Sequence, residues 1–167
     1  LQQLERYVQR LEELDFLLSR EDITEQREQM EKITYQAHYD ILTGLPNRVL
    51  ANDRLMQAVS HARRDGGKAV AIFIDLDHFK EVNDSLGHES GDLLLIEAAR
   101  RIQQCVGERD TVARMGGDEF TILLNGANDL SALETTLQHV LLRLSSAFQV
   151  RSEQVFVSAS LGVAMYP

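Results

Sequence analysis

The stretch that decides the fold is TVARMGGDEFTILL, residues 111–124. Its two ends, Thr111 to Met115 and Phe120 to Leu124, are short apolar segments typical of β-strands, and Gly-Gly-Asp-Glu lies between them. Glycines supply the positive φ angles that a tight connection between strands needs. The stretch therefore predicts a β-hairpin with the carboxylates of Asp118 and Glu119 at its tip.

A second acidic position follows an apolar run from Ala69 to Ile74, which is typical of a buried central strand. Asp75 ends this run. If the hairpin pairs beside it, carboxylates that are distant in sequence meet at one edge of a sheet. Hard cations such as Mg²⁺ take oxygen ligands, so the pattern predicts a divalent-metal site suited to phosphoryl or nucleotidyl transfer. The alternative is an ordinary hairpin with an acidic surface turn, which the short motif alone does not exclude.

The remaining periodicity defines the fold class. Helices are predicted from Leu50 to about His61, from about Glu89 to Val106 and from Leu130 to Phe148, and a strand or hairpin arm from Val155 to Tyr166. In the second helix we expect these apolar residues on the inner side: Leu93, Leu94, Ile96, Ala99 and Ile102. The order predicts an α+β sandwich, in which helices cover one or both faces of a largely antiparallel sheet.

Residues 1–39 differ from the rest because they contain no Gly or Pro. They predict helix, with two sets of a/d positions: Leu4, Tyr7, Leu11, Leu14 and Leu18, then Ile23, Met30, Ile33 and Ala37. The phase breaks near Ser19, so two short helices or one interrupted coiled coil both fit. The alternative is an amphipathic stretch that packs on its own domain.

The bulk properties narrow the class of protein. A chain of 167 residues accommodates one domain and an appendage, and its net charge of -9 argues against binding nucleic acid through phosphates. An acidic protein still binds a nucleotide when a divalent cation joins its carboxylates to the phosphates. We find neither a leader nor about 18 consecutive apolar residues, and therefore expect a cytoplasmic protein without a membrane segment. Because the sequence lacks an initial Met and stops after an apolar run, we expect it to be a fragment.

Four motifs in order resemble one known family. Residues Arg114 to Phe120 contain the signature from which the GGDEF family of diguanylate cyclases is named. The other motifs are Phe73 to Lys80 with its continuation to Asp92, Asp40 to Arg48, and Ser158 to Ala164. The resemblance implies a GGDEF domain with the nucleotide-cyclase-like sandwich over residues 40–167, preceded by a helical signalling linker at 1–39. Asp22 to Glu25 also resembles the linker that joins PAS sensor domains to GGDEF domains.

This resemblance implies a catalytic site. Asp75, the main-chain carbonyl of Leu76 and Asp118 would hold Mg²⁺ or Mn²⁺ on the phosphates of GTP. Asp118 is also a candidate base for the attacking hydroxyl, and Glu119 would support a second metal or the proton transfer. Lys80 would neutralise phosphate charge, as a compact ammonium can.

The resemblance also implies how the substrate binds. Asn83 and Asp92 would hydrogen-bond the guanine edge, and His88 would lie beside the nucleoside. Gly117 would let the main chain approach the nucleotide closely. Taken singly, without the resemblance, these residues fit ordinary roles better: Lys80 as a surface lysine, His88 as a helix cap and Asn83 as a turn former. The remaining motif acid, Asp77, is expected to tie down its loop.

The implied reaction is attack by the 3′-hydroxyl of one GTP on the α-phosphate of another, performed twice. It yields cyclic di-GMP and two pyrophosphates. Each domain presents one GTP, so a homodimer is implied, aligned by the helix that precedes the domain. The parent protein would carry an N-terminal PAS sensor and a C-terminal EAL-type phosphodiesterase. Two alternatives remain: a GTP-sensing module that regulates such a phosphodiesterase without catalysis, and a dimerisation device.

Two departures from the family pattern stand out. The product-inhibition motif of the family is Arg-x-x-Asp, and here Asp110 is present but Gly107 replaces the arginine. This argues against feedback inhibition through that site. Family members also continue past Pro167 into a last helix that supplies a lysine and an arginine to the phosphates. We therefore expect the fragment to bind GTP weakly or to be inactive.

Overall fold

The computed structural model describes residues 10, 24, 26–126 and 129–167. The chain divides into two compact units, Leu1–Ala37 and His38–Pro167. In the first unit, the described residues are helical, with Met30 and Ile33 exposed. The a/d positions from Leu4 to Leu18, as well as Ile23, lie outside the described residues. The coiled coil therefore stays a prediction.

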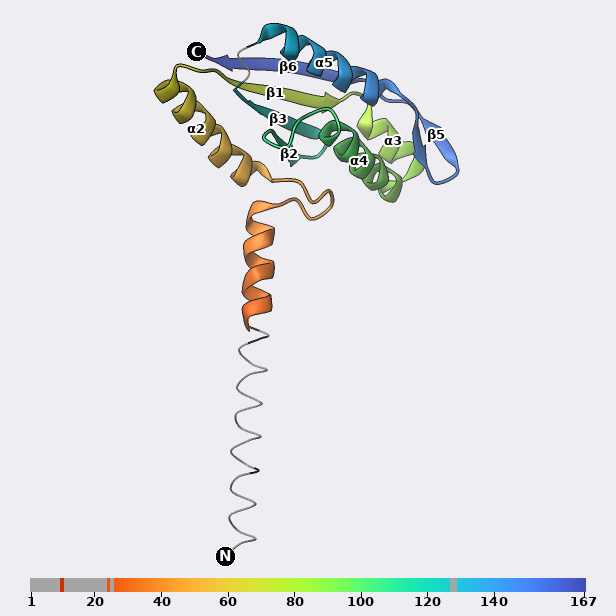
Figure 1. Cartoon of the computed structure of the whole chain (residues 1–167). Coiled ribbons are helices and arrows are strands. Elements are labelled where there is room, and N and C mark those ends of the chain that lie inside the picture. The colour runs from red at the N-terminus through yellow and green to blue at the C-terminus, as the bar shows by residue number, and fades with distance from the viewer. Residues whose placement is uncertain (1–9, 11–23, 25, 127–128) are drawn as a thin grey trace, which may run out of the picture. The chain divides into compact units, whose positions relative to one another are not determined.

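The second unit is built on a four-stranded sheet. Its strands are β1 (Ala69–Leu76), β2 (Thr111–Gly116), β3 (Glu119–Asn125) and β6 (Ala159–Tyr166). They lie in the order β2-β3-β1-β6, and every neighbouring pair is antiparallel (Figure 1). Strand β1 lies inside the sheet, as its continuous apolar run predicted. The α+β class with an antiparallel sheet is confirmed.

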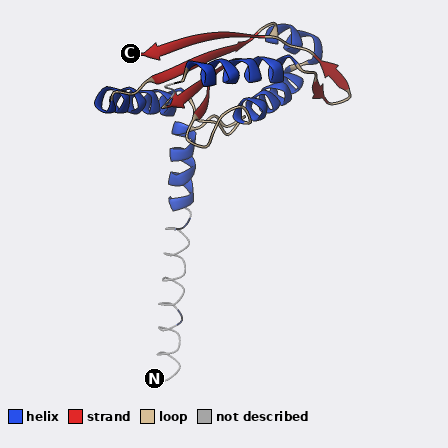
Figure 2. Ribbon diagram, turned by 45° about the horizontal axis from the view of Figure 1, so that its top comes forward, coloured by secondary structure: helices blue, strands red, loops and turns tan. Residues whose placement is uncertain are grey.

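In the described part of the second unit, helices and a small hairpin accompany the sheet (Figure 2). The helices are α2 (Arg48–Asp65), α3 (Phe79–Leu86), α4 (His88–Gln103) and α5 (Leu130–Ser145). The hairpin pairs β4 (Phe148–Val150) with β5 (Glu153–Val155). In the part of the chain that is described, no helix combines the length and the apolar character needed to cross a membrane.

Successive side chains of β1 point to opposite faces of the sheet. The side chains of Val70, Ile72, Ile74 and Leu76 belong to the main core, together with residues of α4 and α5. On the other face α2 lies against the sheet, where Nη1 of Arg54 donates to Oγ1 of Thr111 at 3.1 Å. Burial of each large aliphatic side chain contributes about 1.5–3 kcal/mol. Because α2 covers only part of its face, Phe73 and Asp75 at the end of β1 remain exposed.

Helix α2 has clear start and stop signals. Oδ1 of Asn47 accepts hydrogen bonds from the backbone N–H groups of Val49 and Leu50, at 3.0 and 3.2 Å. The helix ends at Gly66, whose φ of 69° is left-handed and favours glycine. The Asn47 cap thus fixes the start of α2 at Arg48, whose guanidinium lies 4.0 Å from the carboxylate of Glu119 in the glycine hairpin.

Some elements differ from the prediction. Residues 79–86, for which no helix was predicted, form α3, which buries only Phe79 and Val82. So short an amphipathic segment gives little periodic signal. Phe148 was expected in a helix, but it begins β4, and α5 ends at Ser145. Val155 belongs to β5, so the last long strand begins at Ala159.

The predicted inner side of α4 was partly wrong. Leu93 and Ile96 are 43% and 41% exposed, whereas Leu95 and Ala98 are buried. Three consecutive leucines at 93–95 leave the helical phase ambiguous in the sequence. The helix also ends at Gln103 rather than Val106.

Candidate active site

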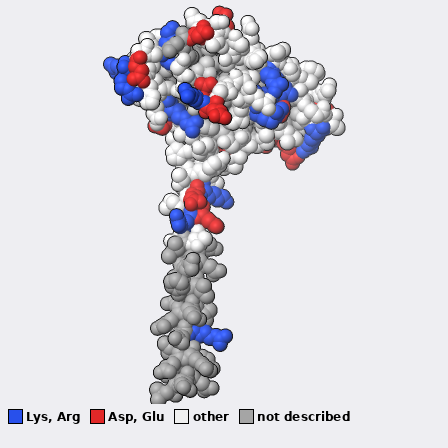
Figure 3. Space-filling view, viewed as in Figure 1, with Lys and Arg blue, Asp and Glu red and all other residues white. Residues whose placement is uncertain are grey.

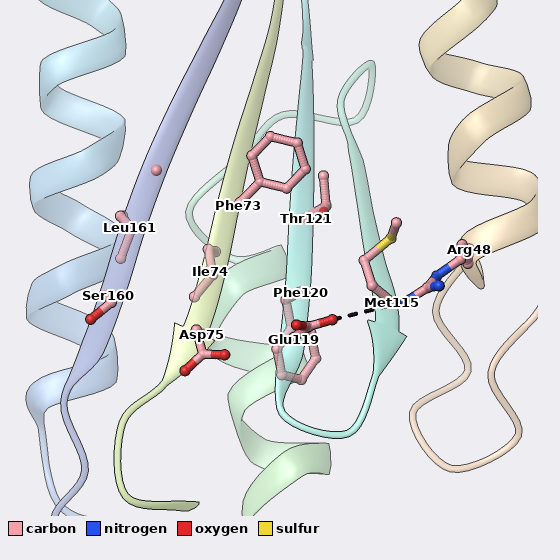
Figure 4. A pocket seen from close by; sticks show the side chains of 11 residues that line it. Arg48, Phe73, Ile74, Asp75, Met115, Glu119, Phe120, Thr121, Ser160 and Leu161 are labelled. Atoms are coloured by element: carbon pink, nitrogen blue, oxygen red, sulfur yellow. Dashed lines mark ion pairs between the residues drawn. The ribbon is translucent and has the colours of Figure 1, made fainter.

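Two acidic side chains from distant segments lie side by side at the end of the central strands. Asp75 of β1 is the direct antiparallel partner of Glu119 of β3. Partners in register project from the same face of a sheet, and Figure 4 shows both carboxylates there. The N–H of Leu76 donates to the carbonyl of Asp118 at 3.3 Å, which brings the glycine turn alongside β1. The predicted meeting of carboxylates at one end of the sheet is therefore present.

The turn that carries Asp118 depends on its glycines and on one arginine. Gly116 and Gly117 have φ angles of 141° and 53°, which strongly favour glycine. Nε and Nη2 of Arg114 donate to the carbonyl of Gly117 at 2.9 and 2.7 Å, and Nη1 lies 3.0 Å from both carboxylate oxygens of Asp40. Arg114 thus supports the turn.

Negative charge accumulates at this end of the sheet. Partial desolvation raises the pKa of Asp75, and the neighbouring charges of Asp118, Glu119 and Asp77 raise it further. Nη2 of Arg48 lies 4.0 Å from a carboxylate oxygen of Glu119, but both side chains are largely exposed, so the pair is weak. The site therefore favours a cation near Asp75.

These residues fit a divalent cation that a substrate helps to hold. Within the described residues, no group of three or more His, Cys, Asp and Glu side chains is arranged to enclose an ion. Mg²⁺ is commonly bound by one or two carboxylates together with substrate phosphates, rather than by a cage of protein ligands. The crowded carboxylates of Asp75 and Asp118 match that mode of binding.

Asp77 is bound by two serines, one just before β6 and one in its first turn of residues. Its carboxylate accepts hydrogen bonds from the hydroxyls of Ser158 and Ser160, at 2.6 and 2.7 Å. These hydrogen bonds lower the pKa of Asp77. The side chain joins the end of β1 to β6, in agreement with the loop-fixing role expected from the sequence.

Three of the predicted substrate residues lie at a different place, the corner between α3 and α4, whereas Gly117 belongs to the turn that carries Asp118. Asn83 is half-buried on α3, while His88 and Asp92 are exposed on the first turns of α4. Gly87, with a φ of 85°, separates the helices, and its N–H donates to the carbonyl of Asn83 at 2.9 Å. Lys80 is exposed at the start of α3. Asn83, His88 and Asp92 thus lie on two helices that meet at this corner. In the sequence, residues 75–92 connect the corner to Asp75 at the end of β1.

A hollow of about 440 Å³ lies beside the acidic pair on the face that α2 partly covers. Its lining includes Arg48, Phe73, Thr121 and Gly162 (Figure 4). Neither the proximity of Arg48 to Glu119 nor the pair of Arg114 with Asp40 was predicted from the sequence. The one hint in the sequence was that Asp40 and Arg48 belong to one family motif and Arg114 to another.

Charges are mixed on the face of the second unit that Figure 3 shows. Figure 3 shows acidic and basic side chains interspersed on the face in view, without one extended basic surface. Clustered Lys and Arg provide most of the affinity of nucleic-acid-binding proteins. The distribution agrees with the net charge of -9.

An antiparallel sheet with carboxylates at a strand end and on a glycine turn agrees with the family comparison. Residues 37–167 match the family described as "Diguanylate cyclase, GGDEF domain". The chain belongs to this GGDEF domain family.

Similar proteins differ in their named activities. The chain is 47% identical over 131 residues, 78% of its length, to the bifunctional diguanylate cyclase/cyclic di-GMP phosphodiesterase MucR of Pseudomonas aeruginosa. It is 39% identical over 155 residues, 93% of its length, to the cyclic di-GMP phosphodiesterase PdeR of Escherichia coli. It spans only 19% and 23% of these two relatives.

One solved structure is similar over most of the chain. The crystal structure of the coiled coil and GGDEF domain of DgcB from Caulobacter crescentus, in complex with c-di-GMP, matches with a TM-score of 0.80. The match has 28% identity and covers 93% of this chain and 83% of that one.

Proposed function

We propose that the protein is a diguanylate cyclase, which condenses two GTP molecules into cyclic di-GMP and releases two pyrophosphates. The observation that carries this proposal is the position of Asp75 beside Glu119 and next to the turn of Asp118. Nucleotidyl transfer depends mainly on positioning and on neutralising phosphate charge, which such a site can provide. Family membership and the similarity to MucR support the proposal.

The metal site would consist of Asp75, the main-chain carbonyl of Leu76 and Asp118. A bound Mg²⁺ or Mn²⁺ would supply charge neutralisation on the phosphates. Asp118 would accept the proton of the attacking 3′-hydroxyl, and Glu119 would assist that transfer or help to hold a second cation. Lys80 would stabilise the negative charge that develops on the phosphates.

Substrate recognition would lie at the corner between α3 and α4. The amide of Asn83 and the carboxylate of Asp92 would pair with the guanine edge, because together they offer donors and acceptors. His88 would lie beside the nucleoside. The backbone at Gly117, which has no side chain, would approach the nucleotide closely.

Two such domains must face each other, because each would present one GTP. We therefore include in the proposal a homodimer, with residues 1–39 as a helical signalling linker and 40–167 as the catalytic domain. A PAS sensor before the linker and an EAL-type phosphodiesterase after the domain complete the proposed parent protein. The similarity to bifunctional MucR favours the phosphodiesterase.

A second candidate is a GTP sensor that regulates a phosphodiesterase without catalysis. The similarity to PdeR, which is named only as a phosphodiesterase, favours this reading. The presence of Asp75, Asn83, Asp92, Asp118 and Glu119 favours the enzyme.

One assay separates the two functions. Full-length protein is incubated with GTP and Mg²⁺, and pyrophosphate and cyclic dinucleotide are quantified. The cyclase proposal expects both products, and a loss of at least about a hundredfold in rate for Asp118→Ala. GTP binding without turnover would identify the sensor, and absence of GTP binding would contradict both functions.

A further inference from the structure

Gly91 is a buried glycine within helix α4, at a place where the helix backbone does not need glycine. Unlike Gly87, it is not among the residues with a positive φ. Within a helix alanine is more favourable than glycine, because glycine loses more conformational freedom on folding. The packing around residue 91 must therefore explain why it lacks a side chain.

The terminal amide of Asn83 occupies the space beside Gly91. A Cβ atom at residue 91 would lie 1.9 Å from Oδ1 and 3.0 Å from Cγ of Asn83. The same Cβ would lie 3.1 Å from Cζ of Phe79, a contact that a shift of a few tenths of an ångström relieves. An alanine at 91 would therefore displace chiefly the amide of Asn83.

The backbone of Asn83 is less able to respond than its side chain. Its carbonyl accepts the hydrogen bond from the N–H of Gly87 at 2.9 Å, at the end of α3. The side-chain torsions would have to change instead. Because the amide presents its donors and its acceptor in fixed directions, a change of torsion redirects all of them.

We propose that Gly91 determines base specificity, because its missing side chain keeps the Asn83 amide in the orientation that reads guanine. This inference rests on the proposed function, which assigns Asn83 to the base. Gly91 is a positioning residue, since it acts only through Asn83. The absence of a side chain at position 91 would thus contribute to the preference for binding GTP over ATP.

The test measures the affinities of full-length protein for GTP and ATP, each with Mg²⁺, by calorimetry. We expect Gly91→Ala to bind GTP at least about tenfold more weakly and ATP unchanged, as Asn83→Ala does. The double variant should bind GTP no more weakly than Asn83→Ala, because both changes remove the same interaction.

Thermal unfolding of the same variants separates packing from recognition. Gly91→Ala should lower the melting temperature when Asn83 is present, but not when residue 83 is alanine. Gly107→Ala is the matched control, because its Cβ would lie 3.4 Å from Oδ2 of Asp110, an ordinary contact. This control should keep the unsubstituted preference for GTP.

The outcomes are distinct. A folded Gly91→Ala variant that keeps the original preference for GTP over ATP overturns the proposal. If Gly91→Ala does not fold, a folded double variant supports the contact with Asn83, and an unfolded one overturns it. If the unsubstituted protein binds no GTP, the proposed function fails first and the specificity proposal fails with it.

Discussion

Arg114 and Asp40, which are 74 positions apart, form an ion pair in which Nη1 of the arginine lies 3.0 Å from both carboxylate oxygens. The same guanidinium also donates two hydrogen bonds to the carbonyl of Gly117. One side chain thus connects the segment before α2 with the turn that carries Asp118. Hydrogen bonds with charged partners are stronger than neutral ones. Arg114 is therefore a main support of the turn.

Arg114→Ala should lower the free energy of unfolding by about 2–4 kcal/mol, because it leaves the partly buried Asp40 without its partner. Arg114→Lys should recover only part of the loss, since an ammonium cannot reproduce the planar fork. Urea denaturation measures the effect. The control is Arg64→Ala, whose pair with Asp65 is largely exposed and should contribute less than about 1 kcal/mol. Equal losses for Arg114→Ala and Arg64→Ala would contradict the supporting role.

Glu97 should make stability depend on pH in acid. Hydrogen bonds from Arg100 and Arg101 outweigh burial and lower the pKa of Glu97 from 4.5 to about 2. An acid with a lowered pKa stabilises the folded state above its unfolded pKa, and that contribution disappears as the pH falls from 4.5 towards about 2. Glu97→Gln should melt lower at neutral pH and show a flatter dependence in this window. Melting temperatures across the window test this, and identical pH profiles would refute it.

The ionisation of Asp75 should change stability with pH in the direction opposite to that of Glu97. Partial desolvation and the neighbouring acids raise the pKa of Asp75, so its charged form is unfavourable in the folded protein without metal. The contribution of Asp75 to stability therefore rises as the pH falls through its folded pKa. Asp75→Asn should melt at a higher temperature than the unsubstituted protein in EDTA, yet gain less from Mg²⁺ and GTP. A lower melting temperature in EDTA would contradict the charge crowding.

Asp110 should not serve a product-inhibition site here. Its carboxylate accepts hydrogen bonds from the N–H groups of Gly107 and Asn125, each at 3.0 Å, and so fixes the loop before β2. We expect cyclic di-GMP to bind this surface at least about tenfold more weakly than in a Gly107→Arg variant, which gains a charged donor. Calorimetry with cyclic di-GMP measures the difference. Equal affinities would show that residue 107 does not control binding.

Local signals in the sequence predicted most of the fold. The apolar run from Ala69 to Ile74 and the glycines at 116–117 are strong signals, because a buried strand and a tight turn need those residue types. The helix α3 and the hairpin β4–β5 were missed, since each is short and depends on packing against the core. Leu93 was assigned to the wrong side of α4, because adjacent leucines offer more than one helical phase.

The site was predicted in part. The meeting of Asp75 with Asp118 and Glu119 followed from a strand end and a hairpin that pair in one sheet. The pairs Arg48 with Glu119 and Arg114 with Asp40 were missed, because they join segments whose proximity only the folded chain reveals. The close approach of Asn83 to Gly91 was not predicted either, because it depends on the angle between α3 and α4.

The proposed cyclase chemistry requires Asp75 and Asp118 to share one cation over a triphosphate. The affinity for Mn²⁺ in the presence of GTP, measured by electron paramagnetic resonance on full-length protein, tests this sharing most directly. We predict that Asp75→Ala and Asp118→Ala each weaken Mn²⁺ binding at least about tenfold. The double variant should bind Mn²⁺ little more weakly than either single variant, because both substitutions remove the same site. Unchanged Mn²⁺ affinity in either single variant would contradict the sharing of one cation.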